Sequence, residues 1–101
     1  MIHVVAQVKV KDGKQQEFLT EFRSIIPAVR EEAGCLEYGP TIDADTDLER
    51  QHTDPRVVTI IEKWESLDDL KAHLSAPHML AYRDRVAGLV ESSRLHILQP
   101  A

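Results

Sequence analysis

The stretch Arg56–Asp69, RVVTIIEKWESLDD, joins a strand pattern to a helix start and decides the fold. Apolar side chains occupy both odd and even positions of residues 56–65, which is typical of a strand buried on both faces. Ser66, followed three residues later by Asp69, matches a capping box, in which the serine hydroxyl accepts a hydrogen bond from the first turn of a helix. The stretch therefore predicts a strand that runs directly into a helix and needs cover on both faces.

The chain before this stretch predicts two strands around one helix. Residues 2–10, IHVVAQVKV, alternate apolar and polar positions as a strand does. Residues 14–33 form an amphipathic helix, Gly34 suits its C-terminal cap, and residues 35–43 form a second strand. Pro40 cannot donate a hydrogen bond to a sheet ladder, so this second strand belongs at an edge. The apolar stripe of the helix consists of Phe18, Phe22, Ile25, Ile26 and Val29.

The chain after this stretch predicts a broken helix and a last strand. A helix begins after Ser66, is interrupted at Pro77, and continues as a second helical segment to about Glu91. Proline is well placed in the first turn of that second segment, where its missing N–H costs nothing. Residues 94–99, RLHILQ, alternate again and form a fourth strand, while the polar residues 44–55 connect the second and third strands.

The element order is strand, helix, strand, strand, helix, strand, which is the ferredoxin-like βαββαβ unit of an α+β protein. We expect a four-stranded antiparallel sheet with both helices on one face and the second strand at an edge. We also expect the first and third strands to be central and parallel to each other. Helices on one face leave an apolar patch on the other, formed by Val5 with Val57 or Val58. This patch predicts a symmetric homodimer.

Length, composition and charge exclude several classes of protein. The 101 residues have room for a single domain, residues 1–101, and 43% hydrophobic with 29% charged residues is typical of a globular protein. The formal net charge is −5 and the twelve Lys and Arg residues are scattered, so we expect no nucleic-acid partner. No signal-peptide pattern and no apolar run of about 20 residues occurs, which predicts a cytoplasmic protein without membrane insertion.

Two histidines, His73 and His78, stand five residues apart in the segment KAHLSAPHMLAY, residues 71–82. In one continuous helix, side chains five apart point about 140° apart. The break at Pro77 bends the axis, so both rings can face one cavity; the alternative is two partly exposed helix histidines. No H-E-x-x-H spacing or third ligand accompanies them, and we expect no metal site.

Glu62 and Trp64 share one face of the third strand. If that face meets the helices, a lone carboxylate and the single tryptophan line a cleft between sheet and helix. Alternatively, Trp64 fills the core and Glu62 pairs with a lysine or arginine, and the sequence leaves both possibilities open. The four glycines are isolated and form no phosphate-binding loop, so we expect no nucleotide-type cofactor.

Four ordered motifs carry a resemblance to a known family. The chain resembles the antibiotic biosynthesis monooxygenase (ABM) family over essentially its whole length, and within it the small bacterial quinol monooxygenases. The resemblance implies a ferredoxin-like dimeric α/β-barrel, in which two sheets pack together and each subunit holds a pocket between sheet and helices. The motifs are Glu31–Tyr38 (EEAGCLEY), Ile61–Leu67 (IEKWESL), Ala72–Met79 (AHLSAPHM) and Ile97–Pro100 (ILQP).

The resemblance also implies a function. It favours a cofactor-independent monooxygenase that acts on a quinol or related phenolic molecule with molecular oxygen as its second substrate. One branch of the family isomerises a phosphorylated signal molecule and carries a similar His-x-x-x-Pro-His segment, so a small-molecule isomerase is the alternative. A non-catalytic binding module would keep the dimer and the pocket without turnover.

The residue types fit a cofactor-free oxygenation. A deprotonated quinol donates electrons to oxygen more readily, so the protein needs a base and a cavity that holds the anion against oxygen. An imidazole exchanges protons near cellular pH and suits the base. We expect His73 or His78 to be the base or to orient it, and Arg83 to face an anion. Glu62, Trp64 and Tyr82 are expected to line the substrate site, the two aromatic residues as its wall.

Overall fold

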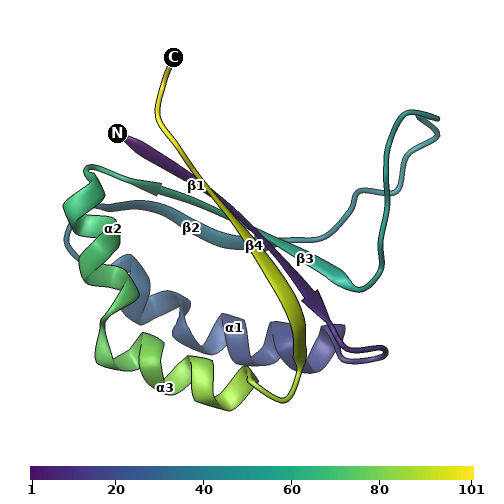
Figure 1. Cartoon of the computed structure of the whole chain (residues 1–101), viewed down its shortest axis with the longest axis horizontal. Helices are drawn as coiled ribbons and strands as arrows, with labels where there is room; N and C mark the ends of the chain where they lie inside the picture. The colour runs from purple at the N-terminus through teal and green to yellow at the C-terminus, as the bar shows by residue number, and fades with distance from the viewer.

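The computed structural model describes all 101 residues. The chain forms one sheet with three helices packed on one of its faces (Figure 1). The order of elements confirms the prediction, with the second helix divided in two. The elements are β1 (Ile2–Val10), α1 (Gln15–Arg30), β2 (Cys35–Thr41), β3 (Val57–Trp64), α2 (Leu67–Leu74), α3 (Pro77–Val86) and β4 (Val90–Leu98).

The sheet has the strand order β2-β3-β1-β4, and every neighbouring pair is antiparallel. The ferredoxin-like α+β fold and the edge position of β2 are therefore confirmed. The expectation that the two central strands are parallel is wrong. The connection through α1 makes β2 run parallel to β1, and the loop after β2 then reverses the direction of the chain. Because β3 lies between them, it runs opposite to both.

The second helix and the last strand differ from the prediction in their bounds. Helix α3 ends at Val86 instead of continuing to Glu91, and β4 begins at Val90 instead of Arg94. Pairing explains the difference: β4 follows β1 along nearly its whole length, and the Lys11 amide donates a further hydrogen bond of 2.8 Å to the Leu89 carbonyl. The satisfied backbone of a long antiparallel ladder outweighs the helical tendency of this short segment.

The core lies between the sheet and the helices. Strand β3 alternates strictly, with Val58, Ile60, Glu62 and Trp64 buried against the helices and the other residues on the opposite face. The two-faced character of this strand is thus confirmed. Val58 belongs to the covered face. On the helix-free face Val5 pairs with Ile61, whereas Val57 pairs with Lys9. The expected patch of Val5 with Val57 or Val58 is therefore wrong, and Ile61 is the apolar neighbour of Val5. The helix α1 buries Phe18, Leu19, Phe22, Ile25 and Val29 against the covered face.

The junction between β3 and α2 is held by the predicted capping box. The Ser66 hydroxyl accepts a hydrogen bond from the Asp69 amide at 3.1 Å and donates one to the Asp69 carboxylate at 2.9 Å. Pro77 is the first residue of α3 and separates this helix from α2, as predicted. None of the helices has the length and hydrophobicity needed to cross a membrane.

Candidate functional site

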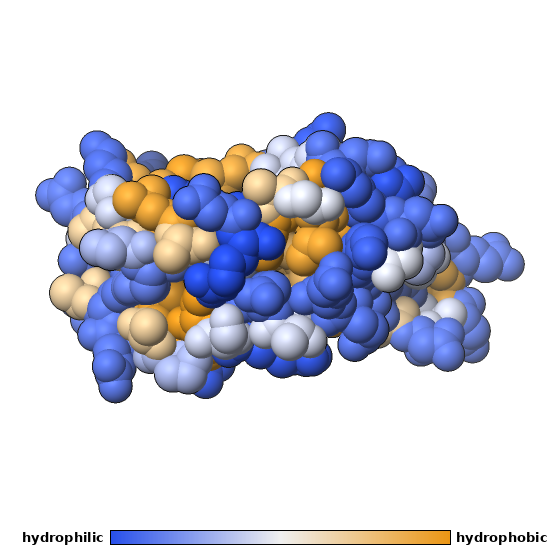
Figure 2. All heavy atoms as spheres, turned by 90° about the horizontal axis from the view of Figure 1, so that it is seen from below, coloured by the Kyte–Doolittle hydropathy of each residue, from blue (hydrophilic) through white to orange (hydrophobic).

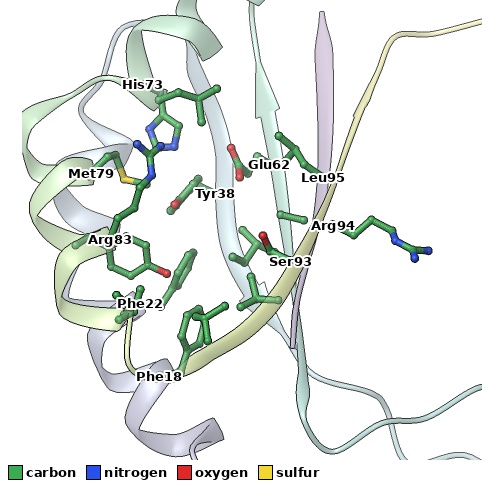
Figure 3. A pocket seen from close by; sticks show the side chains of 18 residues that line it. Phe18, Phe22, Tyr38, Glu62, His73, Met79, Arg83, Ser93, Arg94 and Leu95 are labelled. Carbon is green, nitrogen blue, oxygen red and sulfur yellow. The ribbon is translucent and has the colours of Figure 1, made fainter. Parts of the chain in front are cut away.

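A cavity of about 450 Å³ opens between the sheet and the helices. Thirteen of its 18 lining residues are hydrophobic, so the cavity suits an apolar body with a few polar groups. Figure 2, which views the helix side of the molecule, shows apolar atoms exposed in several patches between hydrophilic side chains. Figure 3 shows that the lining comes from the helices on one side and the strands on the other.

Aromatic rings form one wall of this cavity. Phe22 stacks on Tyr38 with ring centroids 5.2 Å apart and meets Tyr82 edge-on at 6.0 Å, while Phe18 adjoins both Phe22 and Tyr82. Such offset and edge-to-face pairs hold aromatic side chains in fixed orientations. Tyr82 therefore lies where the sequence predicts it, and the two phenylalanines and Tyr38 are wall residues that the prediction missed. Phe18 and Phe22 lie on the apolar stripe of α1 and Tyr38 lies on β2, and the sequence pattern does not distinguish a residue that lines a cavity from one that fills the core.

His73 brings a titratable group to the cavity. It lies on α2, is only 1% exposed, and lines the cavity beside Glu62 (Figure 3). Its ring packs 4.7 Å from Trp64 and 5.3 Å from Tyr38, measured between ring centroids. Trp64 itself is fully buried and is absent from the lining. Trp64 therefore packs against His73 from the side away from the cavity. The prediction that Trp64 forms part of the cavity wall is wrong.

Glu62 is 7% exposed and has its partner on its own strand. Its Oε1 accepts a hydrogen bond of 2.9 Å from Trp64 Nε1. The alternative that pairs Glu62 with a lysine or arginine is therefore wrong, because the strand presents residues 62 and 64 on the same face and the indole reaches the carboxylate first. Glu62 lines the cavity, as the cleft interpretation requires.

The two histidines do converge, on a carboxylate that the sequence analysis did not single out. His73 Nδ1 lies 2.9 Å from Glu32 Oε2, and His78 Nε2 lies 2.8 Å from the same oxygen. His78 is not part of the cavity lining, and its side chain is 33% exposed. Glu32 stands in the EEAG segment after α1, and its place in the first of the four motifs was the one available signal.

Arginine side chains add positive charge at one point of the cavity. Arg83 lines the cavity from α3, forms no salt bridge, and extends toward His73, whereas Arg94 points away from the cavity (Figure 3). An unpaired guanidinium at the rim of an apolar cavity suits an anionic group on a ligand. The structure shows no group of three or more His, Cys, Asp or Glu side chains arranged to hold a metal ion.

Burial changes the acid–base properties of the lining. It raises the pKa of Glu62 above its ordinary value of 4.5, although the Trp64 hydrogen bond and His73 oppose this shift. Burial likewise raises the pKa of Tyr38 and of Tyr82 above the ordinary value of a phenol. Both phenols are therefore neutral hydroxyl groups at cellular pH.

Glu62→Gln is expected to change how stability depends on pH. Because the pKa of Glu62 is raised in the folded protein, the unfolded chain releases this proton first as pH rises, and the wild type loses stability over that interval. The glutamine can still accept from Trp64 and removes this loss. Denaturant unfolding from about pH 4.5 to about pH 7.5 should therefore show the variant gaining stability over the wild type with rising pH. Glu65→Gln, at an exposed position of the same segment, is the control; an equal pH slope in Glu62→Gln and wild type would contradict the prediction.

The fold and cavity together define the class of protein: a ferredoxin-like α+β fold with an apolar cavity between sheet and helices that a buried histidine lines. The sequence profile described as "Antibiotic biosynthesis monooxygenase" matches residues 1–85. The chain is 38% identical to "Probable quinol monooxygenase YgiN" of Escherichia coli K12 over 102 aligned positions, covering 99% of this chain and 98% of the relative.

Solved structures agree with this comparison. Protein SO0527 from Shewanella oneidensis superposes with a TM-score of 0.81 at 30% identity, covering 96% of this chain and 87% of that one. A conserved protein from Methanosarcina mazei gives a TM-score of 0.83 at 27% identity, with 99% and 92% covered. The chain belongs to the antibiotic biosynthesis monooxygenase family, and the comparisons place it among the monooxygenases, which are oxidoreductases.

Proposed function

We propose that the protein is a cofactor-independent monooxygenase that oxidises a quinol or a related phenol with molecular oxygen. The observation that carries the proposal is the placement of His73 on an apolar, aromatic-walled cavity with one ring nitrogen unoccupied. Nδ1 is bonded to Glu32, while Nε2 has no hydrogen-bond partner in the protein. That nitrogen is available to accept a proton from a bound hydroxyl group. The quinol monooxygenase name of the E. coli relative supports the same substrate class.

The reaction balances without an external reductant. His73 takes the proton of a quinol hydroxyl, and the resulting quinolate transfers electrons to oxygen held in the same cavity. One oxygen atom enters a ring C–H bond to form a hydroxyl group, and the other leaves as water. The substrate becomes a hydroxyquinone and supplies all four electrons that reduce the oxygen molecule. The protein contributes the base, the orientation of the two reactants, and the exclusion of water.

The lining residues divide into a wall and a polar set. Phe22, Tyr38 and Tyr82 offer ring faces and edges on which a planar aromatic substrate packs. Arg83 stabilises negative charge that develops on the substrate oxygen after deprotonation. Glu62, in its neutral form, donates a hydrogen bond toward a second substrate oxygen; its raised pKa increases the population of this form.

A phosphorylated substrate, which the isomerase alternative involves, receives less support from the cavity. Recognition of a phosphate usually draws on several donors, arginines or a helix N-terminus that converge on its oxygens. Arg83 is the one cation directed at this cavity, and Arg94 points away from it (Figure 3). The apolar lining favours an uncharged aromatic body.

A homodimer is part of the proposal. The helix-free face of the sheet carries Val5, Val57 and Ile61, and no element of the chain covers them. A second sheet packed on this face would bury these residues and give the barrel that the resemblance implies. Sedimentation equilibrium is expected to give twice the 11.4 kDa mass of one chain, and a single-chain mass at micromolar concentration would refute it. A cytoplasmic location remains our expectation for this assembly.

The direct test of the function is oxygen consumption. Purified, metal-stripped protein is mixed in an oxygen electrode with a panel of benzo- and naphthohydroquinones, and products are identified by mass spectrometry. We expect uptake well above autoxidation for at least one compound, with one oxygen atom from ¹⁸O₂ in the product. Uptake equal to background across the whole panel would exclude the proposed function. Uptake that yields unlabelled quinone and peroxide would show an oxidase instead of a monooxygenase.

A further inference from the structure

The cluster of His73, Glu32 and His78 lies partly outside the cavity. We propose that Glu32 and His78 are positioning residues: Glu32 fixes the neutral His73 ring with its proton on Nδ1, and His78 holds the Glu32 carboxylate in place. This inference rests on the proposed function in taking His73 as the base. It adds two residues that touch neither substrate nor oxygen and that determine which nitrogen of His73 accepts the proton.

The first step is the burial of the bond between Glu32 and His73. The His73 side chain is 1% exposed and that of Glu32 is 15% exposed, so water competes little for this contact. Both carboxylate oxygens lie within reach of His73 Nδ1, at 2.9 Å and 3.1 Å. No lysine or arginine forms a salt bridge with Glu32, so the two histidines are its only side-chain partners.

The second step follows from the chemistry of the two groups. An ionised carboxylate only accepts hydrogen bonds, so the nitrogen that faces it must carry a proton. The hydrogen bond at one ring nitrogen thereby determines the state of the other. In neutral His73 the proton lies on Nδ1, and Nε2 presents its lone pair to the cavity. Without Glu32, the ring is free to adopt the opposite tautomer, in which Nε2 carries the proton and cannot accept one.

The third step concerns His78. Its Nε2, not its Nδ1, lies 2.8 Å from Glu32 Oε2, so the same argument places the proton of a neutral His78 on Nε2. The two rings therefore have opposite tautomers around one carboxylate. The three residues come from the turn after α1, from α2 and from α3, and the break at Pro77 allows α3 to present His78 to Glu32. A carboxylate held by a second donor has less freedom to turn away from His73.

The test of the tautomers does not depend on activity. Long-range ¹H–¹⁵N correlation spectra of uniformly ¹⁵N-labelled full-length protein distinguish the two nitrogens of each neutral histidine. We expect His73 to carry its proton on Nδ1 and His78 to carry its proton on Nε2. In Glu32→Gln, His73 is expected to lose its single tautomer. The matched control Glu31→Gln removes an exposed carboxylate one residue away and should leave both spectra unchanged. A wild-type His73 with its proton on Nε2 would overturn the inference.

Kinetics with the most active hydroquinone of the panel test the consequence. Glu32→Gln is expected to lower kcat on the order of 10²–10⁴-fold with little change in KM, because substrate still binds while the base presents the wrong tautomer. His78→Leu should lower kcat roughly tenfold, and His78→Gln, which can place an amide donor near the same point, should restore most of it. Equal kcat in Glu32→Gln and Glu31→Gln would overturn the inference. Oxygen uptake absent from the wild type, with the predicted tautomers present, would refute the proposed function and leave the tautomer assignment standing.

Discussion

His73→Asn is expected to lower kcat for quinol oxidation by about 10²–10⁴-fold, the usual contribution of a general base. The asparagine amide can occupy the place of Nδ1 and still donate to Glu32, so the buried contact survives while the proton acceptor at Nε2 is lost. Because the aromatic wall is untouched, KM should change much less than kcat. Oxygen uptake under saturating quinol measures this effect directly.

The control for this variant is another histidine. His52→Asn makes the same substitution at an exposed position of the loop between β2 and β3 and should retain wild-type turnover. Near-UV circular dichroism of the variant should match the wild type, as expected if the aromatic packing around position 73 is intact. If His73→Asn keeps more than about half of the wild-type kcat, proton abstraction belongs to another group, and Glu62 is then the cavity residue to test.

Gly34→Ala is expected to destabilise the protein by roughly 2–4 kcal/mol, lowering Tm by about 10–20 °C. Gly34 has a φ of +78°, which an alanine adopts only with strain. A Cβ atom at this position would also overlap the Asp69 carboxylate and so disturb the capping box at the start of α2. Both effects act on the same junction, two residues from Glu32.

Two other glycines separate these effects. Gly13 has a similar φ of +74° and open space around its Cα, so Gly13→Ala measures the strain alone. Gly88 has neither a positive φ nor a neighbour near the added atom, and Gly88→Ala should be nearly neutral. Denaturant unfolding of the three variants should rank the losses Gly34, Gly13, Gly88. A loss at Gly34 no larger than that at Gly13 would contradict the predicted overlap with Asp69.

The order of elements was predictable because each depends on local signals. The alternation of residues 2–10, the apolar run of residues 56–65, the apolar stripe of α1, the Ser66 cap and Pro77 are all signals that extend over a few residues of chain. The direction of β3 relative to β1 needs the path of the whole chain, and the parallel arrangement expected for them was wrong. The start of β4 depends on pairing with β1 across the sheet, so the sequence of residues 90–93 alone did not indicate it.

Only part of the candidate site was predictable, because some of its residues are distinctive by themselves and others depend on contacts between distant parts of the chain. His73, Glu62, Tyr82 and Arg83 stand out as chemically distinctive residues, and the structure brings them to one cavity. Glu32 lies 41 residues from His73 and is one of 17 acidic residues, most of which face water. Its partners are set by the tertiary packing of the turn after α1 against α2 and α3, which no spacing rule in the sequence expresses.

In the proposed mechanism, the break at Pro77 separates the residues that select the substrate from those that carry out the acid–base chemistry. His73 and its supports, Trp64 and Tyr38, lie in the buried half of the site, while much of the rim of the cavity comes from α3 and β4, including exposed Arg83 and Leu95. Substitutions along that rim can reshape the opening without moving the proton acceptor. A protein with this proposed arrangement can acquire new substrates through surface substitutions of small thermodynamic cost while its proton acceptor stays in place.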